Sequence, residues 1–212
     1  EKLQAFRTAL EKNPELRENV TLVQLLVPSR EDVPAYKNLK GDIEKLVSQI
    51  NGEFGIHDWT PVKYIHRSVP RDELVAMYRA AEICLVTSLK DGMNLVAKEY
   101  CASQIDDRGV LILSEFAGAA IQLGKDALLV NPHDREGTAD AIIRALNMPI
   151  EEKIERMSSM RRSIRKRDVF WWVNNFLRAA MNRKLKDFPE REIAPFRPHR
   201  SHEKLARSER NV

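Results

Sequence analysis

The sequence has few cysteines and no long apolar run. Its 212 residues include two cysteines, Cys84 in a strand-like apolar segment and Cys101 in a helix-like one. Two isolated thiols argue against a disulfide framework or a cysteine metal site and are typical of a reducing compartment. No segment approaches the roughly 18 apolar residues of a membrane span, and the first residues lack a signal-peptide pattern. We therefore expect a cytoplasmic protein without a membrane partner.

The net charge of +4 is concentrated near the C-terminal end. Residues 183–212 hold nine Lys or Arg and five acidic residues, so the rest of the chain is neutral overall. A second basic cluster spans residues 161–167. Neither cluster is accompanied by an aromatic platform or a recognised nucleic-acid motif, so both are interpreted as solvated surface. We expect no nucleic-acid partner, and a nucleic-acid-binding module is the least favoured alternative.

Short β-branched runs alternate with longer segments of helical period. Strands are expected at residues 20–27, 61–66, 83–87, 110–114 and 127–130. Helices are expected at residues 2–11, 36–51, 71–81, 94–104, 118–123, 135–147, 150–166 and 169–183. Nearly continuous apolar strands are typical of a parallel sheet covered on both faces, and repeated βα units give right-handed crossovers. The predicted fold class is α/β, a Rossmann-like doubly wound parallel sheet.

The chain is predicted to form one domain over residues 1–183, followed by a mobile basic tail over residues 184–212. Hydrophobic residues make up 43% and charged residues 31%, as in ordinary globular domains. The chain opens inside a predicted helix, so we expect that a strand upstream of it is missing. Phe170, Trp171, Trp172 and Phe176 make the last helix dense in aromatic residues. We expect them to pack against another domain.

One strand–turn–helix segment carries the strongest candidate site. The strand ends near Thr87, and a helix begins near Asn94, directly after Asp91, Gly92 and Met93. In a parallel sheet, the carboxyl ends of strands and the helix N-termini that follow form the ligand crevice. Free backbone N–H groups and the helix dipole suit a phosphate there, and Gly92 permits a positive φ or a close backbone approach. The segment therefore predicts a phosphate-binding helix start.

Carboxylates near this helix start suit a nucleotide sugar. Asp91 can accept hydrogen bonds from a sugar hydroxyl, and Glu99 lies about 7.5 Å along the helix at 1.5 Å per residue, where it can hold a ribose diol. The same residues also suit a purely structural interpretation, in which Asp-Gly makes a turn, Asn94 caps the helix and Glu99 is a surface residue. The pattern alone leaves both interpretations open.

Residues 90–100, Lys-Asp-Gly-Met-Asn-Leu-Val-Ala-Lys-Glu-Tyr, closely resemble the donor-site signature of the trehalose-6-phosphate synthases. Further similar blocks follow in the family's order, at residues 27–33, 50–52, 59–61, 114–120 and 131–132. The resemblance extends from the first residues to about Leu177. It implies the B-type glycosyltransferase fold, in which two Rossmann-like domains enclose the active site. This chain resembles the C-terminal, donor-binding half.

The resemblance implies a retaining glucosyltransferase. Such an enzyme moves glucose from UDP-glucose to glucose 6-phosphate and releases trehalose 6-phosphate and UDP. The expected partners are these small-molecule substrates and the missing N-terminal Rossmann domain, and a homo-oligomer is left open. No cofactor or metal ion is expected, and the DxD-like metal motif of other sugar transferases is absent. Stabilisation of the departing pyrophosphate charge is the implied source of catalysis, without a covalent intermediate.

Individual roles follow from the resemblance. The backbone amides of Leu95 and Val96 are expected to bind the diphosphate, and Glu99 the ribose hydroxyls. The residues expected around the transferred glucose are Asp91, Gly92, Met93 and Asn94. Asp91 is the catalytic candidate and bonds a glucose hydroxyl. Val69 lies where the family's backbone contact to uracil falls, and Arg30 matches an arginine associated with the acceptor phosphate.

The chain departs from the family pattern at several positions. Ser88 and Lys90 stand where the family has proline and arginine, and His133 replaces a common tyrosine. The family's Arg and Lys that bind the donor diphosphate lie just before Glu1, so we expect the chain alone to be catalytically incomplete and to bind UDP-glucose weakly. Two alternatives remain: a related glycosyltransferase with another acceptor, such as glycerol 3-phosphate, or another nucleotide sugar, and a non-catalytic regulatory domain of the same fold.

Overall fold

The computed structural model describes residues 1–28 and 33–180. The chain divides into two units, Glu1–Asp168 and the segment that begins at Val169. The strands are β1 (Leu22–Leu26), β2 (Val62–His66), β3 (Ile83–Val86), β4 (Val110–Ser114) and β5 (Leu128–Val130). They confirm the predicted strands to within two residues at each end.

The strands pair only in parallel, as predicted. β1 pairs with β2, with Leu22 opposite Val62. A separate sheet has the order β3-β4-β5, with Ile83 opposite Val110 and Ile112 opposite Leu128. The parallel α/β fold is thus confirmed, and within the described residues its strands form a two-stranded and a three-stranded sheet. β1 and β3 are not hydrogen-bonded to one another, so each presents an edge.

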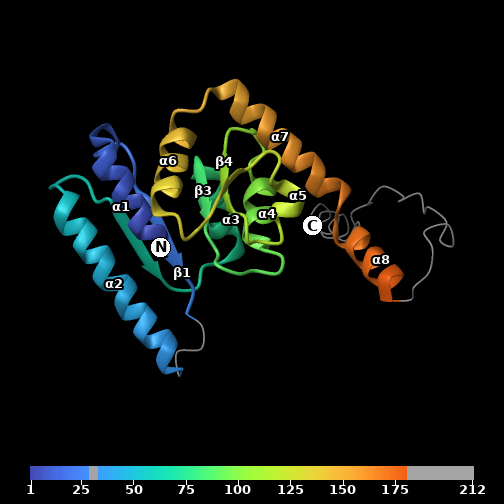
Figure 1. Cartoon of the computed structure of the whole chain (residues 1–212), viewed down its shortest axis with the longest axis horizontal. Helices are drawn as coiled ribbons and strands as arrows, with labels where there is room; N and C mark the ends of the chain where they lie inside the picture. Colours follow the sequence, from blue (N-terminus) through green and yellow to red (C-terminus); the bar gives the residue numbers. More distant parts are fainter. Residues whose placement is uncertain (29–32, 181–212) are drawn as a thin grey trace, which may run out of the picture. The chain divides into compact units, whose positions relative to one another are not determined.

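Helices connect the strands and flank the sheets (Figure 1). The helices of the first unit are α1 (Lys2–Lys12), α2 (Pro34–Phe54), α3 (Arg71–Ala80), α4 (Leu95–Ser103), α5 (Ala120–Leu123), α6 (Arg135–Leu146) and α7 (Ile150–Lys166). They confirm the predicted helices, and α2 extends two or three residues further at each end. A short 3-10 helix, η1 (Pro14–Leu16), follows α1 and was not predicted. Asn13 supports it, because its side-chain oxygen accepts a hydrogen bond from the backbone N–H of Glu15.

Two apolar cores lie in this unit. The first joins α1, α2 and α6 to both sheets, with Phe6, Leu10 and Ile50 among its buried members. The second joins α4, α5 and α7 to the three-stranded sheet, and it includes Tyr100 and Met157. Figure 1 shows α1 beside α6 and α7 running past α4 and α5. Helices therefore pack on opposite sides of β4, whose five residues are all buried, as expected for a central strand of a parallel sheet.

Asn51 ties α2 to the neighbouring strand β2. Its side-chain amide donates to the backbone oxygen of Val62 at 3.0 Å and accepts from the backbone N–H of Val62 at 2.9 Å. One side chain thereby satisfies both the backbone N–H and the backbone C=O of Val62, the first residue of the strand. This contact gives a structural role to Asn51, the middle residue of the block at residues 50–52.

A substitution at Gly41 tests whether α2 is a continuous helix. It lies exposed inside α2, and a methyl group built on its Cα meets nothing within 4 Å. We expect Gly41→Ala to raise the free energy of unfolding by about 1 kcal/mol, because alanine restricts the unfolded chain and favours the helix. Urea unfolding of the two proteins measures the difference. A lower stability of the alanine variant would contradict a continuous helix at this point.

The second segment contains α8 (Val169–Ala180), in which the rings of Trp172 and Phe176 stack at 5.4 Å between centroids. The predicted continuation of this helix to residue 183 and the predicted tail over residues 184–212 lie outside the described residues. No helix in the described part of the chain is long and apolar enough to cross a membrane.

Candidate functional site

The turn between β3 and α4 is organised by Asn94. β3 ends at Val86, and α4 begins at Leu95 at the carboxyl end of the sheet. Asn94 has a left-handed backbone, with φ 62° and ψ 83°, and its side-chain oxygen caps α4 by accepting from the N–H of Ala97 at 2.9 Å. Asparagine tolerates this conformation better than most residues and is a strong N-cap. The predicted helix start is therefore confirmed.

The carboxylate of Asp91 points into its own turn. One oxygen accepts from the backbone N–H of Met93 at 3.1 Å and from that of Asn94 at 2.9 Å. The other oxygen accepts from the side-chain amide of Asn94 at 2.9 Å. A carboxylate has about four acceptor positions, so these three bonds leave about one for a ligand. Asp91 thus shapes the turn, and its predicted bond to a glucose hydroxyl remains a prediction.

The first turn of α4 leaves backbone donors available. In any α-helix the first N–H groups lack an intrahelical acceptor, and here the cap of Asn94 takes the group of Ala97. Leu95 and Val96 precede it, and the two residues are 58% and 45% exposed. The first turn of α4 carries no acidic residue to compete with an anion for the helix dipole. The two amides predicted to bind a diphosphate therefore lie at a helix N-terminus, and no group in the described residues accepts a hydrogen bond from them.

Close backbone packing occurs at Gly118, which the sequence did not single out. Its N–H donates to the backbone oxygen of Asp91 at 2.9 Å, and a Cβ there would lie 2.1 Å from the backbone oxygen of Gly92. Gly92 itself has open space, and no glycine in the described residues has a positive φ. Asn94, and not Gly92, therefore takes the positive φ in this turn, and Gly118 allows the two loops to approach closely; a close approach of Gly92 to a ligand stays a prediction.

The loops that follow β3, β4 and β5 meet at the carboxyl end of this sheet. Asp91 forms a parallel bridge with Ala117 in the loop after β4. In that same loop, the ring of Phe116 lies 6.2 Å from that of His133, which follows β5. His133 is exposed, and its backbone N–H donates to the side chain of Asn131. These contacts build one continuous rim, as expected where a parallel sheet binds a ligand.

Glu99 lies one turn further along α4 with an exposed side chain. The hydroxyl of Tyr78, on α3, lies 3.4 Å from one of its carboxylate oxygens. Burial raises the pKa of Tyr78 to about 12, and the negative charge of Glu99 adds to this. The phenol therefore stays protonated at neutral pH and can donate to the carboxylate. Sequence reasoning identified Glu99 and missed Tyr78, which lies 21 residues earlier.

The remaining predicted positions are more dispersed. Val69 is half-buried in the loop between β2 and α3, next to Pro70, which precedes α3. Arg30 lies outside the described residues. Lys90 is exposed, and the hydroxyl oxygen of Ser88 is buried without a hydrogen-bond partner in the described part of the chain. The structure thus places Asp91 through Glu99 together in one turn and helix start, and the binding roles of these residues, of Val69 and of Arg30 stay predictions.

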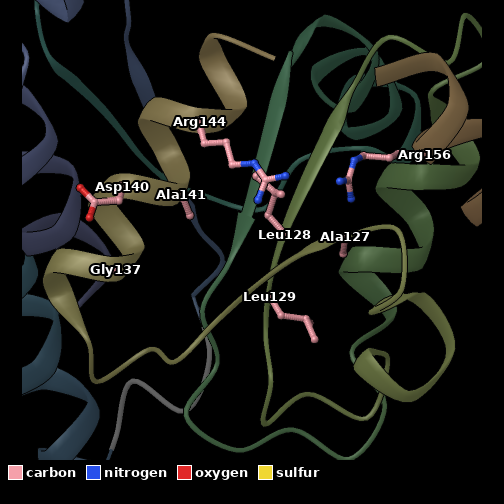
Figure 2. A pocket seen from close by; sticks show the side chains of 8 residues that line it. All are labelled: Ala127, Leu128, Leu129, Gly137, Asp140, Ala141, Arg144 and Arg156. Carbon is pink, nitrogen blue, oxygen red and sulfur yellow. The ribbon is translucent and has the colours of Figure 1, made fainter. Parts of the chain in front are cut away.

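A separate hollow lies beside the edge strand β5, between α6 and α7 (Figure 2). Arg144 and Arg156 point toward its centre, but both contact the carboxylate of Glu152, at 3.6 and 2.7 Å. Asp140, on its rim, pairs with Lys12 at 2.7 Å. Each of these charged side chains therefore already has an ion-pair partner, although the two arginines share one carboxylate. No residue of the turn at Asp91 lines it.

The parallel sheets, the helices on both sides and the helix N-terminus at the carboxyl end of β3 define a Rossmann-like domain of the B-type glycosyltransferase fold. A family model for glycosyltransferase family 20 matches residues 1–182, and the chain belongs to that family.

Relatives of known name support this assignment. The chain is 50% identical over 186 residues to the trehalose-6-phosphate synthase of Mycobacterium leprae, covering 88% of this chain and 37% of the relative. A Burkholderia xenovorans alpha,alpha-trehalose-phosphate synthase in complex with glucose-6-phosphate is 42% identical, with a TM-score of 0.82 over 85% of this chain and 40% of that one. An E. coli structure bound with UDP-2-fluoro glucose is 40% identical, with a TM-score of 0.81 over 86% and 40%. The chain thus spans less than half the length of these relatives.

Proposed function

We propose that this chain is the donor-binding half of an alpha,alpha-trehalose-phosphate synthase (UDP-forming). The complete enzyme would move glucose from UDP-glucose to glucose 6-phosphate and release trehalose 6-phosphate and UDP. The start of α4 carries the proposal, because it offers two free backbone amides close to the Asp91 turn and the exposed carboxylate of Glu99. The relatives that bind glucose-6-phosphate and UDP-2-fluoro glucose support the choice of substrates.

In this proposal the chain acts by positioning and by stabilising charge. The diphosphate lies on the N–H groups of Leu95 and Val96, where the helix dipole stabilises the negative charge that grows as UDP departs. Glu99 accepts hydrogen bonds from the two ribose hydroxyls, and Val69 contacts the uracil through its backbone. The glucose lies against residues 91–94, with Asp91 using its remaining acceptor position for a hydroxyl.

The acceptor and the rest of the enzyme complete the proposal. Arg30 would bind the phosphate of glucose 6-phosphate, and a second Rossmann-like domain would close the cleft. The protein would work in the cytoplasm, with no membrane or nucleic-acid partner. We propose that transfer needs no metal ion, because helix N–H groups supply the positive potential at the diphosphate. Activity that survives EDTA would support this point, and activity restored only by a divalent cation would refute it.

A titration of UDP into the chain tests the donor site. We expect Glu99→Gln to weaken UDP binding about 10-fold or more, since a hydrogen bond to a charged group contributes about 1.5–3 kcal/mol. Calorimetry or ligand-observed NMR at millimolar UDP gives the dissociation constants. Glu155→Gln, an exposed glutamate on α7, is the matched control and should bind like the wild type. Failure of the full-length protein, with its second Rossmann-like domain, to bind UDP would favour a non-catalytic domain of the same fold.

A further inference from the structure

The carboxylate of Glu99 has one hydrogen-bond partner in the described part of the chain. Tyr78 lies opposite it on the neighbouring helix, 3.4 Å from the carboxylate oxygen Oε2. We propose that Tyr78 is a positioning residue for Glu99: its hydroxyl holds Oε2 so that the rest of the carboxylate faces the ribose of the bound nucleotide. This inference rests on the proposed donor site and adds to it a residue that selects for ribose hydroxyls.

The contact joins a half-buried donor to an exposed acceptor. A free glutamate side chain samples many rotamers, and ordering it on binding opposes affinity. A hydrogen bond from a fixed neighbour reduces this loss, because the carboxylate is already close to its binding orientation. At 3.4 Å the bond is longer than a usual O–H···O bond, so it is weak without ligand. We expect nucleotide binding to shorten it, as happens to many hydrogen bonds in unliganded sites.

Neighbouring groups fix the position of Tyr78, so it can orient the carboxylate of Glu99. Its ring meets the ring of Tyr100 edge-on, with 6.3 Å between centroids and 79° between planes. Its backbone oxygen accepts a hydrogen bond from the side-chain amide of Gln104. The hydroxyl of Tyr100 lies 3.1 Å from the backbone oxygens of both Ala81 and Glu82. Two side chains of the α4 segment thus bind the end of α3, so the distance from Tyr78 to Glu99 is set by well-packed groups.

The packing around these two side chains leaves little room for adjustment. A Cβ on Gly109 would lie 2.3 Å from the hydroxyl oxygen of Tyr100 and 2.7 Å from the amide carbon of Gln104. Tyr100 is fully buried, and Gln104 is nearly so. The two helices are therefore linked by buried polar groups as well as by apolar contact. The Tyr78 hydroxyl stays protonated at neutral pH and lies opposite a carboxylate, which only accepts, so Tyr78 is the donor in its contact with Glu99.

Removal of the hydroxyl alone gives the first test. Tyr78→Phe keeps the ring, and its unfolding midpoint checks that the fold is retained. We expect the variant to bind UDP about 3- to 10-fold more weakly than the wild type does. It should bind 2′,3′-dideoxy-UDP as tightly as the wild type binds that nucleotide. Tyr64→Phe is the matched control, because that buried hydroxyl oxygen has no hydrogen-bond partner in the described residues. Equal losses for both nucleotides, or no loss for UDP, would overturn the proposal.

A double-mutant cycle separates this inference from the donor site itself. If Tyr78 acts through Glu99, then Tyr78→Phe should have no further effect on UDP affinity in the Glu99→Ala background. A further loss of similar size in that background would show that Tyr78 acts independently, and it would refute the positioning role while leaving the donor site intact. A wild type that does not discriminate UDP from the dideoxy nucleotide would instead refute the ribose site, and the positioning role with it.

Discussion

Gly118→Ala is expected to destabilise the protein by about 3 kcal/mol, at the upper end of the usual cost of overpacking. The added methyl group would lie 2.1 Å from the backbone oxygen of Gly92 and 3.2 Å from the Cα of Met93. Neither atom can rotate away, since both belong to the backbone of the turn. The loop after β4 must therefore move, and the hydrogen bond from Gly118 to Asp91 is weakened with it. A thermal unfolding midpoint lower by roughly 6–12 °C would express this loss.

Gly92→Ala is the matched control for stability. It lies on the other side of the same contact, yet a Cβ there meets nothing within 4 Å, and its φ is negative. Its free energy of unfolding should change by no more than about 0.5 kcal/mol. We also expect Gly118→Ala to weaken UDP binding, because the displaced turn carries the start of α4. Equal stability of the two alanine variants would contradict the contact between the two loops.

The strands and helices could be predicted because their signals are local. β4 is a run of apolar residues that is buried throughout, and such a run predicts a central parallel strand without any tertiary information. The helix start at Leu95 was predicted for a similar reason, because Asn94 is an N-cap residue in front of an apolar segment. The division of the strands into two sheets could not be predicted, since strand adjacency depends on contacts between distant segments.

The candidate site was predicted in its position but not in its internal contacts. The sequence leaves open whether Asp91 faces a sugar or shapes the turn, and the structure shows that its carboxylate accepts three hydrogen bonds from its own turn. Both uses suit an aspartate directly before this helix start, so the sequence pattern cannot separate them. Gly118 and Tyr78 were missed for another reason: each acts on a residue more than 20 positions away, and only the fold brings them together.

Asn94→Ala is expected to cost about 2–3 kcal/mol, because three separate contributions are lost at one position. The N–H of Ala97 loses the side-chain oxygen that caps the helix, and such a cap usually contributes about 1 kcal/mol. Alanine lacks the local side-chain hydrogen bonds that help asparagine tolerate a left-handed backbone at φ 62°, so it bears more of the about 1–2 kcal/mol that this backbone costs a residue with a Cβ. Asp91 also loses the amide that pairs with its second oxygen. Urea unfolding should report the total.

Asn94→Gly separates the backbone cost from the loss of the side chain. Glycine accepts the positive φ without strain, so this variant should recover about 1 kcal/mol relative to Asn94→Ala while still lacking both side-chain hydrogen bonds. Both variants should weaken UDP binding, since the start of α4 is no longer fixed against the turn. Equal stability of the glycine and alanine variants would show that the left-handed backbone relaxes when the amide is removed. In that case the amide of Asn94 alone, through Asp91 and Ala97, would hold the turn in the conformation that presents the helix N-terminus to a phosphate.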